Sequence, residues 1–455
     1  MAASSDTANQ SLLSRVRIIH ALPVVPFILI GVFVSDAISD NSFLWHVRAG
    51  SAQRSAGAVL NEDIFTFTEQ GTGWRTQSWL AELLYAAIES TTTSLVWVNW
   101  MILVVAAATL VFMAIAVYRS VPSPVMTAVA LIVAVWLLGP FLQPRPVIFS
   151  FLLLAALVVV LQNKERVLWA AIPIMWVWAG IHGSWIIGGL LIVLYWLSTA
   201  DKAIFRIGLI ALVATLATAH GIGTWLVVMD FFGSQDALDQ MQEWQPPDFG
   251  GLPQMPYLLL IGGVIVAGVR GRITPRDLIV ILPFLFLGMT SRRTVVPAAI
   301  VLLPWAAMAL PVVKVPKSAT RPAVAVAAVA LMALLVMAPM GLDTVGSLDP
   351  ERFPSEEARA AISGENTFYD DGVGGYLIYR EWPERLVWFD DRAELHGVER
   401  SLEFQGAVAG VYREVFDDYG FTTALSRPDW ALTETLIADG WTVTHEDDHF
   451  IVLVR

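Results

Sequence analysis

The sequence predicts an α-helical polytopic membrane protein with a small α/β domain at its C-terminal end. Of the 455 residues, 56% are hydrophobic and only 15% are charged, whereas a soluble globular protein carries about 25% charged residues. The apolar residues also gather in repeated runs, as they do in helices that cross a bilayer. A third observation, the concentration of acidic residues near the C-terminus, separates a hydrophilic segment from the apolar body.

The charge is divided unevenly along the chain. Residues 341–455 contain 24 Asp and Glu, 9 Arg and no Lys, so their formal charge is −15, while the whole chain carries −12. The first 340 residues are therefore close to neutral. An acidic segment of this kind is not drawn to nucleic acid or to anionic lipid. The chain has no Cys, which excludes disulfides and thiolate metal sites.

Eleven apolar runs are candidate membrane spans, and several are shorter than the about 20 residues of a simple span. Lys and Arg lie mostly in alternate connections between the runs. By the positive-inside rule, the N-terminus is cytoplasmic, whereas the first long loop and the C-terminal segment are external. The runs are residues 18–34, 95–117, 125–142, 147–161, 167–180, 185–197, 207–219, 256–269, 278–289, 295–313 and 323–340.

This topology divides the chain into three predicted parts. Residues 1–17 form a disordered cytoplasmic N-terminus, residues 18–340 the transmembrane domain, and residues 341–455 an external acidic α/β domain. The transmembrane domain includes a long first outer loop, residues 35–93. Within that loop, residues 74–90 have the apolar spacing of a helix that lies on the membrane surface.

The predicted C-terminal domain mixes strands with helices. The sequences RLVWFDD at residues 385–391 and FIVLVR at residues 450–455 are typical of strands. Residues 429–440 predict a helix with a glycine just past its end. The Gly-Gly pair at residues 374–375 indicates a tight backbone approach or a turn.

Polar residues gather directly after the first apolar run, where Asp40 precedes a Trp-His pair that contains His46. Two interpretations are open. The stretch is an anchored turn, in which Asp40 is the N-cap of a helix that starts at Asn41, or it begins a site at the membrane surface. Asp36 is a neighbouring carboxylate, and Asp63 is a second loop acid whose structural alternative is a turn.

The order of these and later motifs resembles the family C glycosyltransferases (GT-C), multi-span enzymes that use lipid-phosphate-linked sugars, and in particular a bacterial polytopic branch of that superfamily. The branch has an acid before Trp-His, then Gly, an Asp-x-Phe-Ser/Thr-x-Thr run, Trp, and a Trp-Leu-x-Glu helix. The matching residues are Asp40, Trp45, His46, Gly50, Asp63, Phe65, Thr66, Thr68, Trp74 and residues 79–82. Further matches, over nearly the whole chain, are RPVIFSF, WAGIHGS, QEWQPPD, SRR, GGYLIY and VWFDDR.

The chain departs from the branch at three places. Ser42 stands where the opening motif has a second acid. An Asn-Leu-His-Gly element is replaced by residues 180–183, Gly-Ile-His-Gly, and an Asn-Pro-x-Gly element by residues 218–221, Thr-Ala-His-Gly. Because of these departures, the alternative that the chain is a catalytically silent relative of these enzymes stays open.

The resemblance implies an inverting glycosyltransferase at the outer face of a bacterial plasma membrane. Its donor would be a polyprenyl-phosphate sugar, and its acceptor is not defined by the sequence. Asp40 is the implied general base, with Asp36 and Asp63 as alternatives, because a carboxylate must take the proton of the acceptor hydroxyl. Asp40 and Asp63 are also the implied ligands of an Mg2+ or Mn2+ ion.

Positive charge must meet the donor phosphate as it leaves, and guanidinium groups do this with paired donors. Arg145, Arg292 and Arg293 are the candidate phosphate-binding residues. The prolines on both sides of Arg145 fix its backbone and so suit a rigidly aimed side chain. No acidic residue is adjacent to Arg292 and Arg293 in the sequence, so lipid headgroups are also possible ligands of these two arginines.

Three further residues complete the candidate site: His46, His182 and Glu243. His182 interrupts an apolar run, and ionisable groups at membrane depth are functional candidates by default. Both histidines have a structural alternative as packed residues. The topology predicts one outward-facing cavity lined by Asp40, His46, Arg145, His182 and one of Arg292 or Arg293.

Two other functions fit the same features. A transporter or flippase of lipid-linked sugar would share the spans and the arginines, but it needs neither an external base nor a folded outer domain. A catalytically silent GT-C-like scaffold would use its acidic domain to dock a partner. The sequence contains no Walker A loop, dinucleotide fingerprint or zinc motif.

Overall fold

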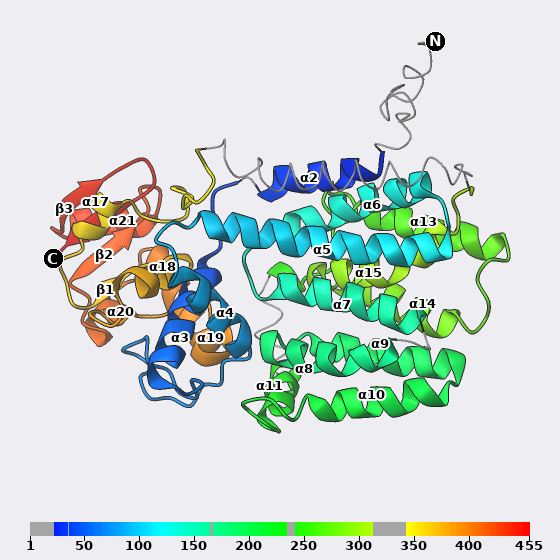
Figure 1. Ribbon diagram of the computed structural model, residues 1–455. Helices are drawn as coiled ribbons and strands as arrows, with labels where there is room; N and C mark the ends of the chain where they lie inside the picture. The colour runs from blue at the N-terminus through cyan, green and yellow to red at the C-terminus, as the bar shows by residue number, and fades with distance from the viewer. Residues whose placement is uncertain (1–21, 35, 164–166, 234–241, 313–342) are drawn as a thin grey trace, which may run out of the picture. The chain divides into compact units, whose positions relative to one another are not determined.

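Helices make up most of the chain, and its strands form one small sheet (Figure 1). The computed structural model describes residues 22–34, 36–163, 167–233, 242–312 and 343–455. The chain divides into two compact units, each built from three stretches. Unit 1 comprises Met1–Asp36, Val96–Thr218 and Met241–Val345, and unit 2 comprises Ala37–Leu95, Ala219–Gln240 and Gly346–Arg455.

The first predicted outer loop belongs to the same unit as the C-terminal segment. Ile38 pairs with Leu348, and Thr66 with Val387, in isolated β-bridges. The sequence placed the loop in the transmembrane domain and drew a single boundary near residue 341. The β-bridges between the first loop and the C-terminal segment join residues far apart in the chain, and such pairs cannot be recognised from the local sequence. The predicted boundary near residue 341 therefore rested only on the increase in acidic residues there.

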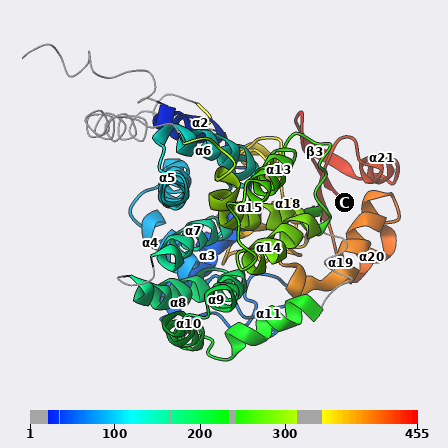
Figure 2. The same ribbon diagram turned by 90° about the vertical axis from the view of Figure 1, so that its right-hand side faces the viewer.

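Unit 1 is a bundle of apolar helices that share a common axis direction, as the side view (Figure 1) and the end-on view (Figure 2) both show. Its centre is α15, which contacts α5, α6, α7, α13 and α14 and is buried from Thr294 to Ala307. The helices are α2 (Val25–Val34), α5 (Val96–Ser120), α6 (Pro124–Leu138), α7 (Val147–Gln162), α8 (Ala171–Ile181), α9 (Trp185–Thr199), α10 (Lys202–Ala214), α13 (Pro256–Val269), α14 (Leu278–Thr290) and α15 (Arg292–Ala307). In the described part of unit 1, the 3-10 turns are η2 (Leu22–Val24), η3 (Gly139–Phe141), η4 (Leu168–Ala170) and η5 (Gln242–Trp244).

The predicted apolar runs from residue 95 to residue 313 each coincide with a helix of unit 1, with shifts at the ends. The largest shift of a helix start is at α10, which begins five residues earlier than predicted. Asp201 explains this start, because its side chain accepts the backbone N–H of Ala203 at 2.8 Å and so caps the helix. The last run, residues 323–340, lies outside the described residues.

Among the described residues, two helices are long and apolar enough to cross a membrane by length and composition: Val96–Ser120 and Pro124–Phe141. Six further apolar helices have between 10 and 17 residues. The prediction of about eleven spans is therefore not confirmed.

Several helices of unit 1 carry an apolar stripe that is exposed. On α10, Phe205, Leu209 and Val213 are exposed at a spacing of four residues, and α14 exposes Leu282 and Phe286 in the same way. A helix at a water-facing surface has polar residues on its exposed face. Contiguous apolar surface of this kind indicates contact with lipid or with a protein partner.

Unit 2 combines a four-stranded sheet with short helices. The strand order is β1-β2-β4-β3, in which β1 and β2 are parallel and the other pairs are antiparallel. The strands are β1 (Thr367–Phe368), β2 (Thr423–Ser426), β3 (Thr442–Glu446) and β4 (Ile451–Val454). The helices are α3 (Asn41–Ala56), α4 (Trp79–Glu89), α11 (Gly223–Gly233), α17 (Glu356–Ala360), α18 (Asp371–Glu381), α19 (Ala393–Val408), α20 (Arg413–Asp418) and α21 (Ala431–Ala438).

The C-terminal predictions have mixed outcomes. The strand at residues 450–455 and the helix at 429–440 are confirmed as β4 and α21. The strand at residues 385–391 is wrong, because only Val387 pairs, through one isolated bridge to Thr66. The apolar residues of this segment are buried by side-chain packing, without the hydrogen bonds of a β-sheet.

The pair of glycines at residues 374–375 lies inside α18, not in a turn, and the predicted tight approach is present. A Cβ atom on Gly374 would lie 2.2 Å from the carbonyl oxygen of Phe389. A Cβ atom on Gly375 would lie 2.4 Å from the carbonyl oxygen of Asn41. Glycine is therefore required where α18 packs against α3 and against the segment after Val387.

We expect Gly374→Ala to destabilise the protein by about 1–3 kcal/mol, because the added methyl must push backbone atoms apart. Gly406→Ala is the matched control. Gly406 lies in α19 of the same unit, and its nearest neighbour would be 3.9 Å from the new Cβ, so helix propensity should leave stability unchanged or raise it by up to about 1 kcal/mol. Thermal unfolding midpoints of the purified variants measure both. Equal midpoints for Gly374→Ala and wild type would contradict the close approach.

Candidate functional site

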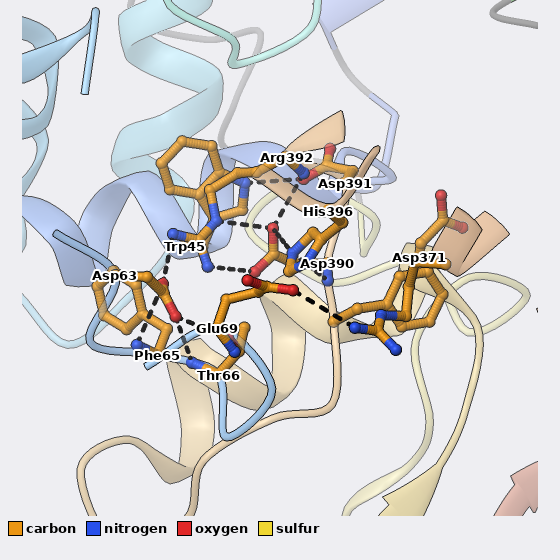
Figure 3. Close-up of polar contacts among 12 residues, drawn as sticks. Trp45, Asp63, Phe65, Thr66, Glu69, Asp371, Asp390, Asp391, Arg392 and His396 are labelled. Carbon is orange, nitrogen blue, oxygen red and sulfur yellow. Dashed lines mark hydrogen bonds and ion pairs between the residues drawn. The ribbon is translucent and has the colours of Figure 1, made fainter. Parts of the chain in front are cut away.

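A buried ion-pair cluster in unit 2 centres on Arg392 (Figure 3). Its guanidinium is fully buried, with Nη1 2.7 Å from Asp63 Oδ1 and Nη2 2.6 Å from Asp390 Oδ2. Arg392 Nε also donates to Asp390 Oδ1 at 2.8 Å. Three aromatic rings lie 4.6–5.6 Å from the guanidinium carbon: Trp74, Phe65 and Trp45.

Asp63 is fully occupied by this cluster and by its own turn. Oδ2 accepts the backbone N–H and the hydroxyl of Thr66, at 3.0 and 2.6 Å. Oδ1 accepts the backbone N–H of Phe65 at 3.3 Å and faces Arg392. The geometry therefore gives Asp63 the turn and ion-pair role.

The charges of Arg392 and Asp390 shift each other's pKa. Burial alone would raise the pKa of Asp390, but the adjacent Arg392 charge outweighs burial and holds that pKa well below its usual range. Burial would lower the pKa of Arg392, and the carboxylates of Asp390 and Asp63 raise it above its usual value. Because the folded pKa of Asp390 lies below the unfolded value of about 3.9, the stabilisation is complete above that value and is lost as the pH falls toward the folded pKa.

The residues present do not fit the divalent metal that the resemblance implies. Asp63 is engaged by its own turn and by Arg392, and Asp40 accepts the backbone N–H of Phe43 at 2.9 Å as the N-cap of α3. In the part of the chain that the structure describes, no group of three or more His, Cys, Asp or Glu side chains is placed to hold a metal. We therefore assign no ligand role to Asp40 or Asp63.

Asp40 and Asp36 belong to different units. Asp40 is buried and caps α3, which is the anchored-turn arrangement. Asp36 is exposed, and its backbone oxygen accepts the side-chain amide of Asn99 at 3.2 Å. The base role of either carboxylate stays a prediction.

His46 pairs with Glu82, a residue to which the sequence analysis gave no role. Nδ1 of His46 lies 2.8 Å from Oε1 of Glu82, and both side chains are buried. Glu82 also accepts hydrogen bonds from Gln53 Nε2 and from the hydroxyl of Thr76. One signal could have revealed it: Glu82 lies on the buried face of α4, in register with Tyr85 and Ala86.

A second polar group lies in unit 1 and joins three stretches of its sequence. Arg145 Nη1 lies 2.8 Å from Glu243 Oε1, and Arg293 Nε lies 3.5 Å from Glu243 Oε2. The guanidinium of Arg293 lies over the ring of Trp244, 5.5 Å from its centroid. The backbone N–H of Arg292 donates to the carbonyl of Gln245 at 3.0 Å. We call Arg145, Arg292, Arg293 and Glu243 the arginine site.

Two helices begin at the arginine site. Arg145 stands two residues before α7, and Arg292 and Arg293 are the first two residues of α15. Neither helix has a side-chain hydrogen bond at its N-cap. The N-terminal end of a helix carries a partial positive charge and free N–H groups, so both helix ends add to the positive potential of the arginines.

His182 also belongs to unit 1, where it terminates α8. Its Nδ1 accepts the backbone N–H of Ser184 at 3.1 Å and contacts the Ser184 hydroxyl at 2.8 Å. This is the helix-end arrangement that was its structural alternative. Of the residues predicted to line one cavity, the structure joins Arg145 and Arg293 through Glu243. Asp40 and His46 lie in unit 2, and the convergence of the whole set stays a prediction.

Neither a protein-family model nor a curated protein sequence matches the chain. The resemblance to GT-C enzymes therefore stays a prediction from the ordered motifs.

We expect Arg392→Met to destabilise unit 2 by about 3–5 kcal/mol, because it leaves two buried carboxylates without a counter-charge. The control is Arg413→Met. Arg413 pairs with Asp439 at 2.8 Å but is 75% exposed, so its loss should cost about 0–1 kcal/mol. Denaturant unfolding of both variants tests the difference.

The destabilisation of Asp390→Asn relative to wild type should be constant from pH 7 to about pH 5 and shrink below about pH 4. A difference in unfolding free energy that grows on acidification would contradict the pairing.

Proposed function

We propose that the chain is a membrane glycosyltransferase of the GT-C type, which moves a sugar from a polyprenyl-phosphate donor to an acceptor hydroxyl at the outer face of the membrane. The observation that carries the proposal is the arginine site of unit 1, within a bundle whose helices expose apolar stripes. A lipid-linked phosphate presents one anionic group and a long apolar chain, and unit 1 offers a complementary surface for each.

The charges of the arginine site favour an anion. Its four side chains have a formal charge of +2, and the N-terminal ends of α7 and α15 add to it. Arg145 and Arg293 are each 29% exposed, and Glu243 is 45% exposed, so a ligand can reach them. The contact from Glu243 to Arg293, at 3.5 Å, is longer than the contact from Glu243 to Arg145, at 2.8 Å.

The transfer reaction makes use of these charges. The acceptor oxygen bonds to the anomeric carbon while the bond from that carbon to the phosphate oxygen breaks. The acceptor proton moves to a base, and the polyprenyl phosphate leaves with the bonding electron pair. Because negative charge grows on the phosphate as the bond breaks, guanidinium groups stabilise the transition state more than the ground state. A single displacement of this kind inverts the anomeric centre.

The proposed location is a bacterial plasma membrane, with the N-terminus cytoplasmic and the acidic C-terminal part external. The alternation of Lys- and Arg-rich connections supports this orientation. We expect a periplasmic reporter fused after Arg455 to be active and a cytoplasmic reporter at the same position to be silent. The opposite pattern would reverse the orientation and remove the external acceptor from the proposal.

We expect Arg145→Gln and Arg293→Gln each to weaken donor binding roughly 10- to 100-fold, since each loses a charge-assisted hydrogen bond worth about 1.5–3 kcal/mol. The control is Arg272→Gln. Arg272 is an exposed arginine of unit 1 that donates to the carbonyl of Met308 at 2.7 Å, away from the arginine site. Binding of radiolabelled polyprenyl-phosphate sugars to reconstituted protein measures the effect, and mass analysis of the products tests transfer.

The same assay separates the alternatives. Donor binding with release of glycosylated product supports the transferase. Donor binding with movement of the intact donor across the vesicle membrane, and no product, would indicate a transporter or flippase. Equal donor binding by wild type and both arginine variants would remove the arginine site from the proposal, and no donor binding at all would leave the scaffold.

A further inference from the structure

We infer that Glu243 is a built-in competitor of the phosphate at the arginine site and that it promotes release of the polyprenyl phosphate product. The inference rests on the proposed function, because it concerns how the donor of that reaction and its product bind. It gives a role to the acidic member of the arginine site. All the residues involved belong to unit 1.

Glu243 contacts two arginines in the way that a phosphate group would. Its Oε1 lies 2.8 Å from Arg145 Nη1, and its Oε2 lies 3.5 Å from Arg293 Nε. Each carboxylate oxygen therefore faces a different guanidinium group. Carboxylate and phosphate groups both bind guanidinium N–H donors through paired oxygens. Glu243 and the phosphate of a lipid-linked sugar consequently need the same donors and compete for them.

The ion pairs of Glu243 are of a kind that a phosphate can displace. The side chains of Arg145 and Arg293 are each 29% exposed, and that of Glu243 is 45% exposed. Ion pairs that are open to water are screened and contribute little to stability. A carboxylate with this exposure is hydrated when it leaves the arginines, so its displacement does not bury an unpaired charge.

Neighbouring contacts keep the carboxylate close to the arginines. Glu243 lies in η5, and the residues after it are held at the start of α15. The backbone N–H of Arg292 donates to the carbonyl of Gln245 at 3.0 Å, and the guanidinium of Arg293 lies 5.5 Å from the ring centroid of Trp244. A tethered group acts at a high effective concentration, so Glu243 pairs with the arginines again whenever a phosphate leaves.

The charges of the donor and of the product differ, and this difference gives the competition a use. The donor phosphate is bonded to both the sugar and the polyprenyl chain, so it carries one negative charge. The released polyprenyl phosphate is a monoester, which carries about −1.5 to −2 at pH 7. Arginines alone would therefore hold the product more tightly than the donor. The negative charge of Glu243 opposes the monoester more strongly, and product release limits turnover in many enzymes.

Glu243→Gln removes the charge and keeps nearly the same side-chain shape. We expect it to tighten binding of polyprenyl phosphate about 10-fold and of the polyprenyl-phosphate sugar about 3-fold, because the repulsion scales with the charge of the ligand. The control is Asp248→Asn, which removes one charge from the same QEWQPPD motif. Asp248 is exposed and accepts the backbone N–H of Gly250 at 2.9 Å, so both affinities should stay as in wild type. Binding of the two radiolabelled lipids to protein in vesicles of zwitterionic lipid measures these changes.

The transfer assay adds a second readout. Glu243→Gln should lower turnover at saturating donor and strengthen inhibition by added polyprenyl phosphate. Unchanged or weaker binding of polyprenyl phosphate by Glu243→Gln would overturn the inference, as would equal tightening by Asp248→Asn. If Glu243→Gln tightens polyprenyl phosphate but wild type transfers no sugar, the proposed function and the product-release role fall, and the competition at the arginine site stands. If wild type transfers sugar and Glu243→Gln binds both lipids as wild type does, only the inference falls.

Discussion

The ion pairs of Arg392 are the interaction on which unit 2 depends. A fully buried guanidinium needs counter-charges, and they come from two distant parts of the chain: Asp63 in the first long loop and Asp390 in the C-terminal stretch. The cluster therefore fixes which residues of the two stretches meet. Trp45 and Trp74 pack against the same guanidinium, so the segments before and after Asp63 are held by the same centre. The positions of α3 and α4, and with them the pairing of His46 with Glu82, follow from that arrangement.

Much of unit 1 could be predicted from the sequence, because apolar runs bounded by polar residues define helices locally. The run at residues 256–269 coincides with α13, and the cap at Asp40 follows from a standard helix signal. The number of membrane spans could not be obtained in the same way. Several helices are too short for a simple span, and length and composition alone do not decide whether such a helix crosses a bilayer.

The long-range pairs could not be predicted, for a different physical reason. Arg392 was included only in the motif VWFDDR, and Glu82 only in the Trp-Leu-x-Glu motif. The residues that flank a buried charge in the sequence do not reveal that it is buried, because its counter-charge comes from a distant part of the chain. Arg145 and Arg293 were singled out by their positions near the outer boundary, yet Glu243, which joins them, was predicted only as a further candidate residue. Sequence reasoning found the chemically active residue types and missed most of the contacts between them.

The three-part composition of unit 2 has a consequence for the order of events during synthesis. Asp63 leaves the ribosome long before Arg392 exists. At about 5–20 residues per second, roughly 15–65 seconds pass between the two. During that interval the Asp63 carboxylate has its local partners Phe65 and Thr66 but lacks its counter-charge. A truncation that removes the C-terminal stretch therefore leaves the buried Asp63 carboxylate without the guanidinium that neutralises it, although α3 and α4 still have each other to pack against.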